Sequence, residues 1–260
     1  MSDTDSGDDC DVVLYRAPTT VVDSEAIAAW LRERVGGDIE LRDRFLDCYG
    51  DEDLPEELAA ARVLDPYERE TGNTMLGIVR YEERALEHPE RAGGVCYDGL
   101  AVQHALNTRL PASEACEALH VAVLDRVVAT WGDHDGRWHK RVSVLGQPAL
   151  VSVPGLAEAP ARPERYYRAQ QRHALLSGDA PPREALEEEV EGAFLVAGDP
   201  RTTEVLKGYV LQAIHFWTTG EAFCGRENCR LYNAHRQPAL VEAQLRDSDF
   251  CDAHAERYGT

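Results

Sequence analysis

Two short pairs of metal-binding residue types lie near the carboxyl end of the chain. Cys224 and Cys229 have four residues between them, whereas Cys251 and His254, in the sequence FCDAH, have two. Zinc prefers thiolate and imidazole ligands in a tetrahedral arrangement, and chains commonly build such sites from two closely spaced pairs. The spacing therefore predicts a zinc site formed by Cys224, Cys229, Cys251 and His254.

A site of this kind constrains the fold because the protein supplies all four ligands. Closed sites are structural, and zinc binding contributes ~10–16 kcal/mol to the folding of small isolated modules. We therefore expect a structural zinc ion to hold residues 222–258 as a subdomain, with a short helix over 238–245. His235 ranks second to His254 as fourth ligand, because it belongs to neither short pair. The alternative interpretation is that the spacing is coincidental and the cysteines are free thiols.

A long apolar segment, TTEVLKGYVLQAIHFWTTG (202–220), precedes the first cysteine pair. Asp199 is a suitable N-cap, Pro200 is favourable in a first helical turn, and Gly220 is a natural C-terminal stop. Apolar side chains face nearly every direction around the helix axis. This pattern is typical of a helix that is buried on most sides.

The rest of the chain has the patterns of an α/β protein. The order strand, helix, strand over 12–15, 24–35 and 39–41 favours a sheet with crossover helices. We expect residues 65–94 to form a loop, with a short strand at 75–79. The other expected elements are helices at 55–63, 98–110, 162–176 and 181–192, and strands at 95–97, 119–124, 127–131, 140–145 and 149–153. The predicted fold class is α/β (α+β), with a mixed sheet and packed helices.

The charge balance limits the classes of partner. The chain has 47 Asp and Glu residues against 27 Lys and Arg, of which only Lys140 and Lys207 are lysines, and its net charge is −20. This composition is typical of halophilic proteins, whose self-repulsion is screened when the Debye length falls to ~3 Å near 1 M salt. An acidic protein that binds cationic partners is the alternative. Nucleic acid is not an expected partner, because binding phosphate requires a basic surface.

Localisation and domain organisation follow from the same composition. No apolar run approaches the ~18 residues of a membrane span, and the acidic start MSDTDSGDDCD is unlike a secretory signal. We expect a cytoplasmic protein with no membrane association, a disordered acidic tail over 1–10 and a single domain over 11–260. The seven cysteines are an odd number, and disulfides are improbable in a reducing compartment.

Three segments resemble the archaemetzincin-related family of uncharacterised archaeal metallopeptidases. They are VVLYRAPTTVVDSEAIAAWLRERVGGDIELRDRF (12–45), RWHKRVSVLGQPALVSVPGLAEAPARP (137–163), and DPRTTEVLKGYVLQAIHFWTTGEAFCGRENCRLYNAH (199–235) with the following FCDAH. The resemblance implies a metzincin-like core with a long helix and a cysteine-rich structural zinc site. In this family that site ends in F-C-x-x-C, so His254 stands in place of the last cysteine.

The family's catalytic motif, H-E-x-x-H-x-x-G-x-x-H-C, is missing. When Gly220 is placed on the motif's glycine, Ala213 and Ile214 take the places of the first histidine and the glutamate, and Trp217 and Phe223 those of the other two histidines. None of these side chains can hold zinc or accept a proton from water. We therefore expect a non-catalytic, zinc-stabilised member of a metallopeptidase family.

Two alternatives remain open from the sequence. An active metallopeptidase would need a relocated metal site, for which His139, His215 and His235 are candidates, although His215 in an apolar helix is typically a core histidine. A zinc-ribbon-like interaction module would need only the closed site. The partner is unknown, and a peptide or protein could bind in a cleft beside the sheet edge.

Overall fold

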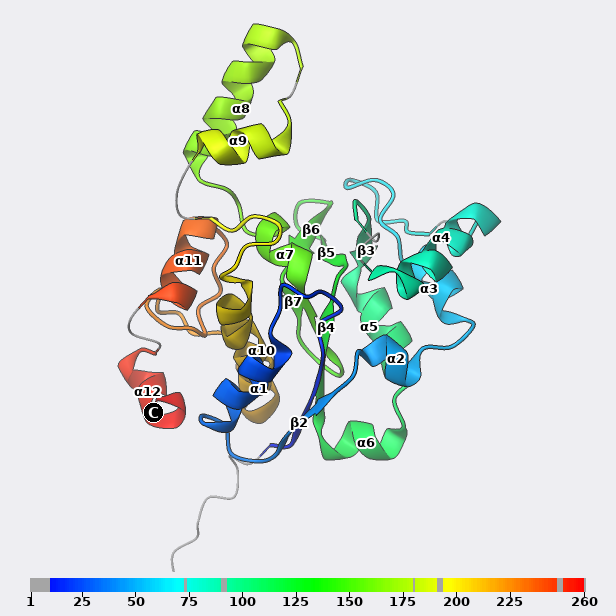
Figure 1. The fold of residues 1–260 in the computed structure, drawn as a ribbon, viewed down its shortest axis with the longest axis vertical. Coiled ribbons are helices and arrows are strands. Elements are labelled where there is room, and N and C mark those ends of the chain that lie inside the picture. Colours follow the sequence, from blue (N-terminus) through cyan, green and yellow to red (C-terminus); the bar gives the residue numbers. More distant parts are fainter. Residues whose placement is uncertain are drawn as a thin grey trace, which may run out of the picture.

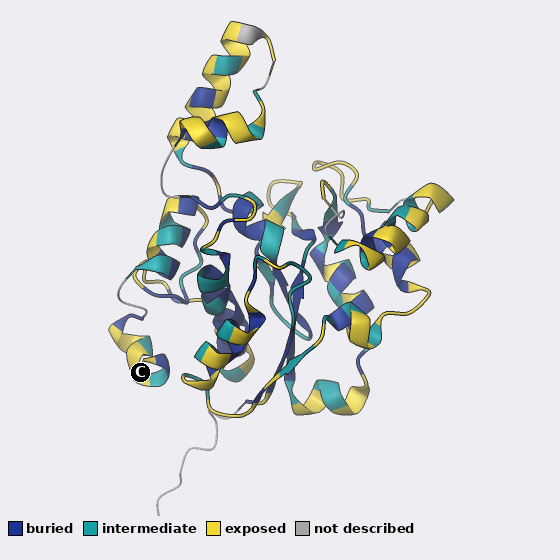
Figure 2. Ribbon diagram, viewed as in Figure 1, coloured by how far each residue is buried: buried dark blue, intermediate teal, exposed yellow. Residues whose placement is uncertain are grey.

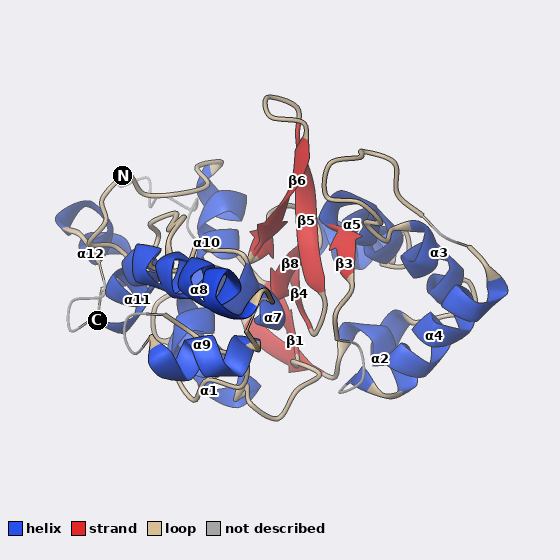
Figure 3. Ribbon diagram, turned by 90° about the horizontal axis from the view of Figure 1, so that it is seen from above, coloured by secondary structure: helices blue, strands red, loops and turns tan. Residues whose placement is uncertain are grey.

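The computed structural model describes residues 10–72, 74–89, 93–179, 181–190, 194–246 and 250–259. The expected disordered tail over 1–10 lies outside these residues except for Cys10, which is buried. Helices cover both faces of a central layer of strands, so the fold class is the expected mixed α/β (Figure 3). Within the described ranges, no helix combines the length and apolar composition needed to cross a bilayer.

The larger sheet has five strands and confirms the strands predicted at 12–15, 39–41, 119–124 and 149–153. In spatial order they are β2 (Ile39–Arg42), β1 (Val12–Tyr15), β4 (Leu119–Leu124), β8 (Ala149–Ser152) and β7 (Ser143–Val144). Neighbouring strands pair in parallel, except that β7 runs antiparallel to β8 at one edge. Residues of β1, β4 and β8 are buried throughout, because helices cover both faces of this sheet.

A second sheet contains β3 (Cys96–Asp98), β5 (Val127–Gly132) and β6 (Arg137–Arg141). The single strand predicted at 140–145 is wrong, because the chain changes sheets within it. Arg141 pairs with Val128 of β5, whereas Ser143 pairs with Val151 of β8. This change of partner depends on contacts with distant strands, which a local apolar pattern does not encode.

One face of the larger sheet packs against the long helix. The elements on this side are α1 (Ser24–Arg32), α7 (Val153–Glu158), α10 (Thr202–Thr219) and α11 (Gln237–Leu245). Helix α10 contacts α1, β4 and β8 and is buried on most sides, as predicted, and it ends at Gly220 with φ 76°.

The start of α10 differs from the prediction. Asp199 is not the helix-capping residue, which is Arg201, but its carboxylate accepts a hydrogen bond from the Arg201 backbone N–H at 2.9 Å. A Cβ on Gly208 would lie 1.8 Å from Gln244 Oε1, so the small residue permits α11 to approach α10 closely.

The opposite face is covered by α2 (Phe45–Tyr49), α3 (Leu54–Ala60), α4 (Leu76–Glu87), α5 (Gly99–Asn107) and α6 (Ala112–Glu117). The loop and short strand predicted within 65–94 are wrong, because α4 occupies twelve residues there. Its central residue Glu82 is fully buried, paired with Arg62 at 2.5 Å and with Arg126 at 3.5 Å, and it accepts a hydrogen bond from Tyr97 at 3.0 Å. A charged residue therefore anchors this helix, through partners that lie outside the helix in the sequence.

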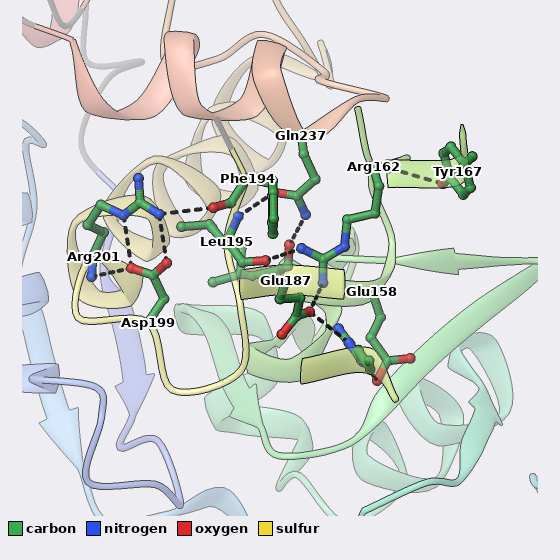
Figure 4. A network of polar contacts seen from close by, with 11 residues as sticks. Glu158, Arg162, Tyr167, Glu187, Phe194, Leu195, Asp199, Arg201 and Gln237 are labelled. Carbon is green, nitrogen blue, oxygen red and sulfur yellow. Dashed lines mark hydrogen bonds and ion pairs between the residues drawn. The ribbon is translucent and has the colours of Figure 1, made fainter. Parts of the chain in front are cut away.

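Helices α8 (Glu164–Ser177) and α9 (Arg183–Glu189) form a hairpin that projects from the body and is largely exposed (Figures 1 and 2). Arg162 ties its base to the core, donating to Leu195 O at 2.6 Å and to Glu187 at 2.7 Å (Figure 4). Gln237, at the start of α11, accepts from Leu195 N–H at 2.9 Å. The backbone of Leu195 therefore links the base of the hairpin, through Arg162, to the start of α11, through Gln237.

Candidate metal centre and adjoining cleft

The four residues of the predicted zinc site lie together. The Sγ atoms of Cys224, Cys229 and Cys251 and a ring nitrogen of His254 are all within 4.8 Å of one another. Cys224 Sγ is 3.8 Å from Cys251 Sγ, and His254 Nδ1 is 3.7 Å from Cys229 Sγ and 3.3 Å from Cys251 Sγ. The edges of a zinc tetrahedron are about 3.8 Å between sulfurs and about 3.5 Å between sulfur and nitrogen, as bond lengths of about 2.3 and 2.0 Å require. The cluster can therefore hold a metal ion of this size.

The chain segments that position the first pair are held by α10 and α11. Cys224 N–H donates to Leu231 O at 2.8 Å, which closes the segment between the two cysteines. The carbonyl of Arg230 accepts hydrogen bonds from Gln212 of α10 at 3.0 Å and from Gln244 of α11 at 2.9 Å. These two buried amides fix the backbone beside Cys229.

The second pair is positioned by a short helix that sequence patterns did not reveal, α12 (Asp252–Tyr258). Cys251 lies just before it, and its carbonyl accepts hydrogen bonds from the N–H groups of His254 and Ala255, both at 2.9 Å. Residues three apart lie on one helical face. The C-x2-H spacing therefore places His254 Nδ1 beside Cys251 Sγ.

The thiols of the cluster differ in pKa, because their surroundings differ. Burial opposes ionisation of Cys251, but hydrogen bonds with His254 and Cys224 outweigh it and lower the pKa of Cys251 to about 7. Burial, together with the neighbouring thiols Cys224 and Cys251, raises the pKa of Cys229 to about 12. A backbone N–H of Arg226 donates to Cys224 Sγ at 3.4 Å. Three sulfurs and an imidazole are a donor set that suits zinc.

His215 of α10 is the nearest histidine outside the cluster, and it is the core histidine that the sequence predicted. It is 3% exposed, and its Nδ1 lies 3.0 Å from the hydroxyl of Tyr258. Burial, followed by the charges of His254 and Arg257, lowers the pKa of His215 to about 4, so the ring is neutral at pH 7.

The three histidines considered for a relocated site do not meet. His139 and His235 line a cavity of 730 Å³, whereas His215 packs beside His254. His235 also lies outside the Cys224 cluster, although it was the alternative fourth ligand. Of the residues that the resemblance aligns with the catalytic motif, Ala213 and Ile214 are buried in the core.

A second group was not recognised in the sequence as a set. His134, Asp135 and His139, at the turn between β5 and β6, have ligand atoms within 4.8 Å of one another. His139 Nε2 is 2.9 Å from Asp135 Oδ1, and His134 Nε2 is 3.7 Å from it. A Cβ on Gly132 would lie 2.6 Å from Asp135 Oδ1, so this glycine permits the arrangement. Two histidines and an aspartate within six residues are the sequence signal for this group.

The 730 Å³ cavity lies between the sheet edge and α10. Its lining comes from β6, β7, residues 159–161, Tyr209, Phe223 and residues 233–235. Phe223 lines this cavity with an apolar side chain, which offers no ligand atom to a metal. The expected cleft beside the sheet edge is therefore present.

Comparisons with known proteins identify the family. Among curated proteins, no sequence matches this chain. The crystal structure of archaemetzincin from Methanopyrus kandleri is similar over 97% of this chain and 95% of its own, with 12% sequence identity and a TM-score of 0.43. A model of a family of unknown function, DUF7001, matches residues 13–257. The chain belongs to this family of unknown function.

Proposed function

We propose that this chain is a zinc-stabilised protein without peptidase activity, in which Cys224, Cys229, Cys251 and His254 hold one structural zinc ion. The observation that carries the proposal is the spacing of the four ligand atoms, which lie within 4.8 Å of one another. Four protein ligands leave no position for a water molecule. Bound zinc would join residues 224–229 to α12, and so hold the end of the chain against α10.

The lack of catalysis is supported by the side chains on α10 and after it. The resemblance places Ala213, Ile214, Trp217 and Phe223 where an active enzyme needs three histidines and a glutamate. Apolar side chains cannot bind a metal or transfer a proton. The zinc-ribbon alternative has less support, because helix α11 lies between the two ligand pairs and His254 itself belongs to helix α12.

A relocated active site is the second candidate, and it is favoured by the group of His134, Asp135 and His139. Three protein ligands with an open position are typical of catalytic zinc. Against it, Arg137 Nε lies 2.7 Å from the other oxygen of Asp135, and its charge would repel a cation. A metal there would also have to displace the hydrogen bond between Asp135 and His139.

Metal analysis of the purified protein decides between the two candidates. We expect one zinc ion per chain, and we expect its removal by a chelator to lower the melting temperature. The double variant Cys224→Ser, Cys229→Ser should lose the zinc, whereas Cys48→Ser, at an exposed cysteine, should keep it. Two zinc ions per chain, one of them lost in His134→Ala, would favour the relocated site. A double variant that keeps its zinc would refute the ligand assignment.

Adaptation to high salt and a cytoplasmic location are further proposals that rest on composition. The net charge of −20 supports the adaptation, because repulsion among carboxylates destabilises the fold until salt screens it. The free energy of unfolding should rise as potassium chloride is raised from about 0.1 M to 1 M. An unchanged or falling value would count against the adaptation.

A further inference from the structure

The 730 Å³ cavity is unusual for a strongly acidic chain because none of the described residues that line it is Asp or Glu. The whole chain has 47 such residues. Three cationic side chains line the cavity instead, those of Arg137, Lys140 and Arg141, together with His139 and His235. The cavity is therefore a locally basic site on an acidic molecule.

Two of the three cations are already neutralised. Arg137 Nε is 2.7 Å from Asp135, and Lys140 Nζ is 2.5 Å from Glu158. Arg141 differs, because within the described ranges no carboxylate lies within 4.0 Å of its guanidinium. Its Nε donates to Thr130 Oγ1 at 2.8 Å, and the other two nitrogens have no partner among the described residues. Burial lowers the pKa of Arg141 below its usual value.

Other arginines in the interior of this protein each face a carboxylate. Arg62 pairs with Glu82 at 2.5 Å, Arg126 with Asp125 at 2.9 Å, and Arg162 with Glu187 at 2.7 Å. Partial burial of a guanidinium without a counter-ion is unfavourable. Arg141 is therefore a cation whose partner is missing from the described part of the chain.

A second polar group faces the cavity without a partner. Tyr209 of α10 lines it and is 6% exposed, and its hydroxyl makes no hydrogen bond with any described residue. The guanidinium of Arg141 and the hydroxyl of Tyr209 supply several hydrogen-bond donors to the cavity. No carboxylate lies among the described residues that line it. Such donors bind carboxylates and phosphates, which accept hydrogen bonds at two or more oxygens.

We propose that this cavity binds a small oxyanion, with Arg141 pairing with its carboxylate or phosphate group and Tyr209 donating a further hydrogen bond. The volume of 730 Å³ is within the range of small-molecule sites. The cavity is separate from the proposed zinc cluster, because none of Cys224, Cys229, Cys251 and His254 lines it. Binding can therefore be tested independently of the zinc proposal.

Calorimetric titration of the full-length protein with inorganic phosphate and with succinate, at constant ionic strength, tests this assignment. Glycerol, which has similar size but no charge, serves as the neutral control. At least one of the two anions should bind, and the tighter one identifies the class of oxyanion. Arg141→Gln should weaken binding roughly tenfold or more, as the loss of a charged hydrogen bond requires.

Three further variants separate binding from folding. Tyr209→Phe should weaken binding several-fold, whereas Arg137→Gln, which lines the same cavity but is already paired, should change it less than about twofold. Arg141→Lys should give intermediate affinity, because it keeps the charge and loses the planar fork. Circular dichroism and zinc content are measured for every variant. No heat of binding for either anion, or equal affinities of the wild type and a folded Arg141→Gln, would overturn the proposal.

Discussion

His215 of α10 packs edge-on against His254 of α12, with ring centroids 5.2 Å apart and planes at 89°. His215 is also hydrogen-bonded to Tyr258, one helical turn beyond His254. Helix α10 therefore supports the candidate metal cluster directly, through a histidine that is neutral at pH 7.

The fourth ligand can be identified by exchange of one side chain. His254→Ala should reduce zinc content and melting temperature, because three thiolates remain. His254→Cys should retain zinc, because it restores four ligands with an acceptable donor set. His235→Ala is the matched control and should retain zinc, since that histidine lies outside the cluster. Zinc loss in His235→Ala but not in His254→Ala would show that the assignment is wrong.

The hydrogen bond between Tyr258 and His215 should stabilise the docking of α12. Tyr258→Phe removes the hydroxyl and leaves a buried ring nitrogen without its partner, so we expect a loss of about 1 kcal/mol in the free energy of unfolding. Urea unfolding measures this difference. Tyr67→Phe, at a side chain that is largely exposed, should change the free energy by less than about 0.5 kcal/mol. Equal effects of the two substitutions would contradict a role for the buried contact.

The buried carboxylate of α4 should be among the most sensitive positions in the protein. Glu82→Gln keeps the shape but leaves the guanidinium of Arg62 without a carboxylate partner, so we expect a loss of about 3 kcal/mol. Glu83→Gln, an exposed neighbour on the same helix, should have little effect on unfolding by urea. If both variants unfolded at the same urea concentration as the wild type, the charge would not anchor α4.

Asp199 should contribute stability that depends on pH. Burial raises its pKa, but hydrogen bonds from Arg201 outweigh this and hold the pKa below its usual range. The folded carboxyl therefore has a lower pKa than the unfolded one, so its stabilisation is present above about pH 4 and lost as the pH falls through the folded value.

The variant Asp199→Asn isolates this contribution. The difference in unfolding free energy between the wild type and Asp199→Asn should be constant between about pH 7 and 5 and should shrink below about pH 4. Zinc release in acid affects both proteins, so the difference remains informative. A difference that stayed constant down to about pH 3 would rule out the carboxylate as its source.

Much of the fold could be predicted because its strands and its longest helix are apolar over consecutive residues. The segments VVLY, LHVAVL and ALVS became buried parallel strands, and α10 became a helix enclosed on most sides. The predictions failed where partners distant in the chain decide the structure. Helix α4 forms around a buried ion pair with Arg62, and the 140–145 segment is divided between two sheets.

The sequence by itself determined which four residues are available as a closed set of sulfur and imidazole donors, because ligand spacing and helical geometry are local properties. Only the tertiary structure decided that the two pairs meet, that His235 lies apart from them, and that His215 and Tyr258 pack against the cluster. It alone brings Arg141 and Tyr209 to one cavity from which carboxylates of the described residues are absent. Distances between segments far apart in the chain arise from the packing of α10, α11 and α12 on the sheet, and no short-range pattern of residues contains that information.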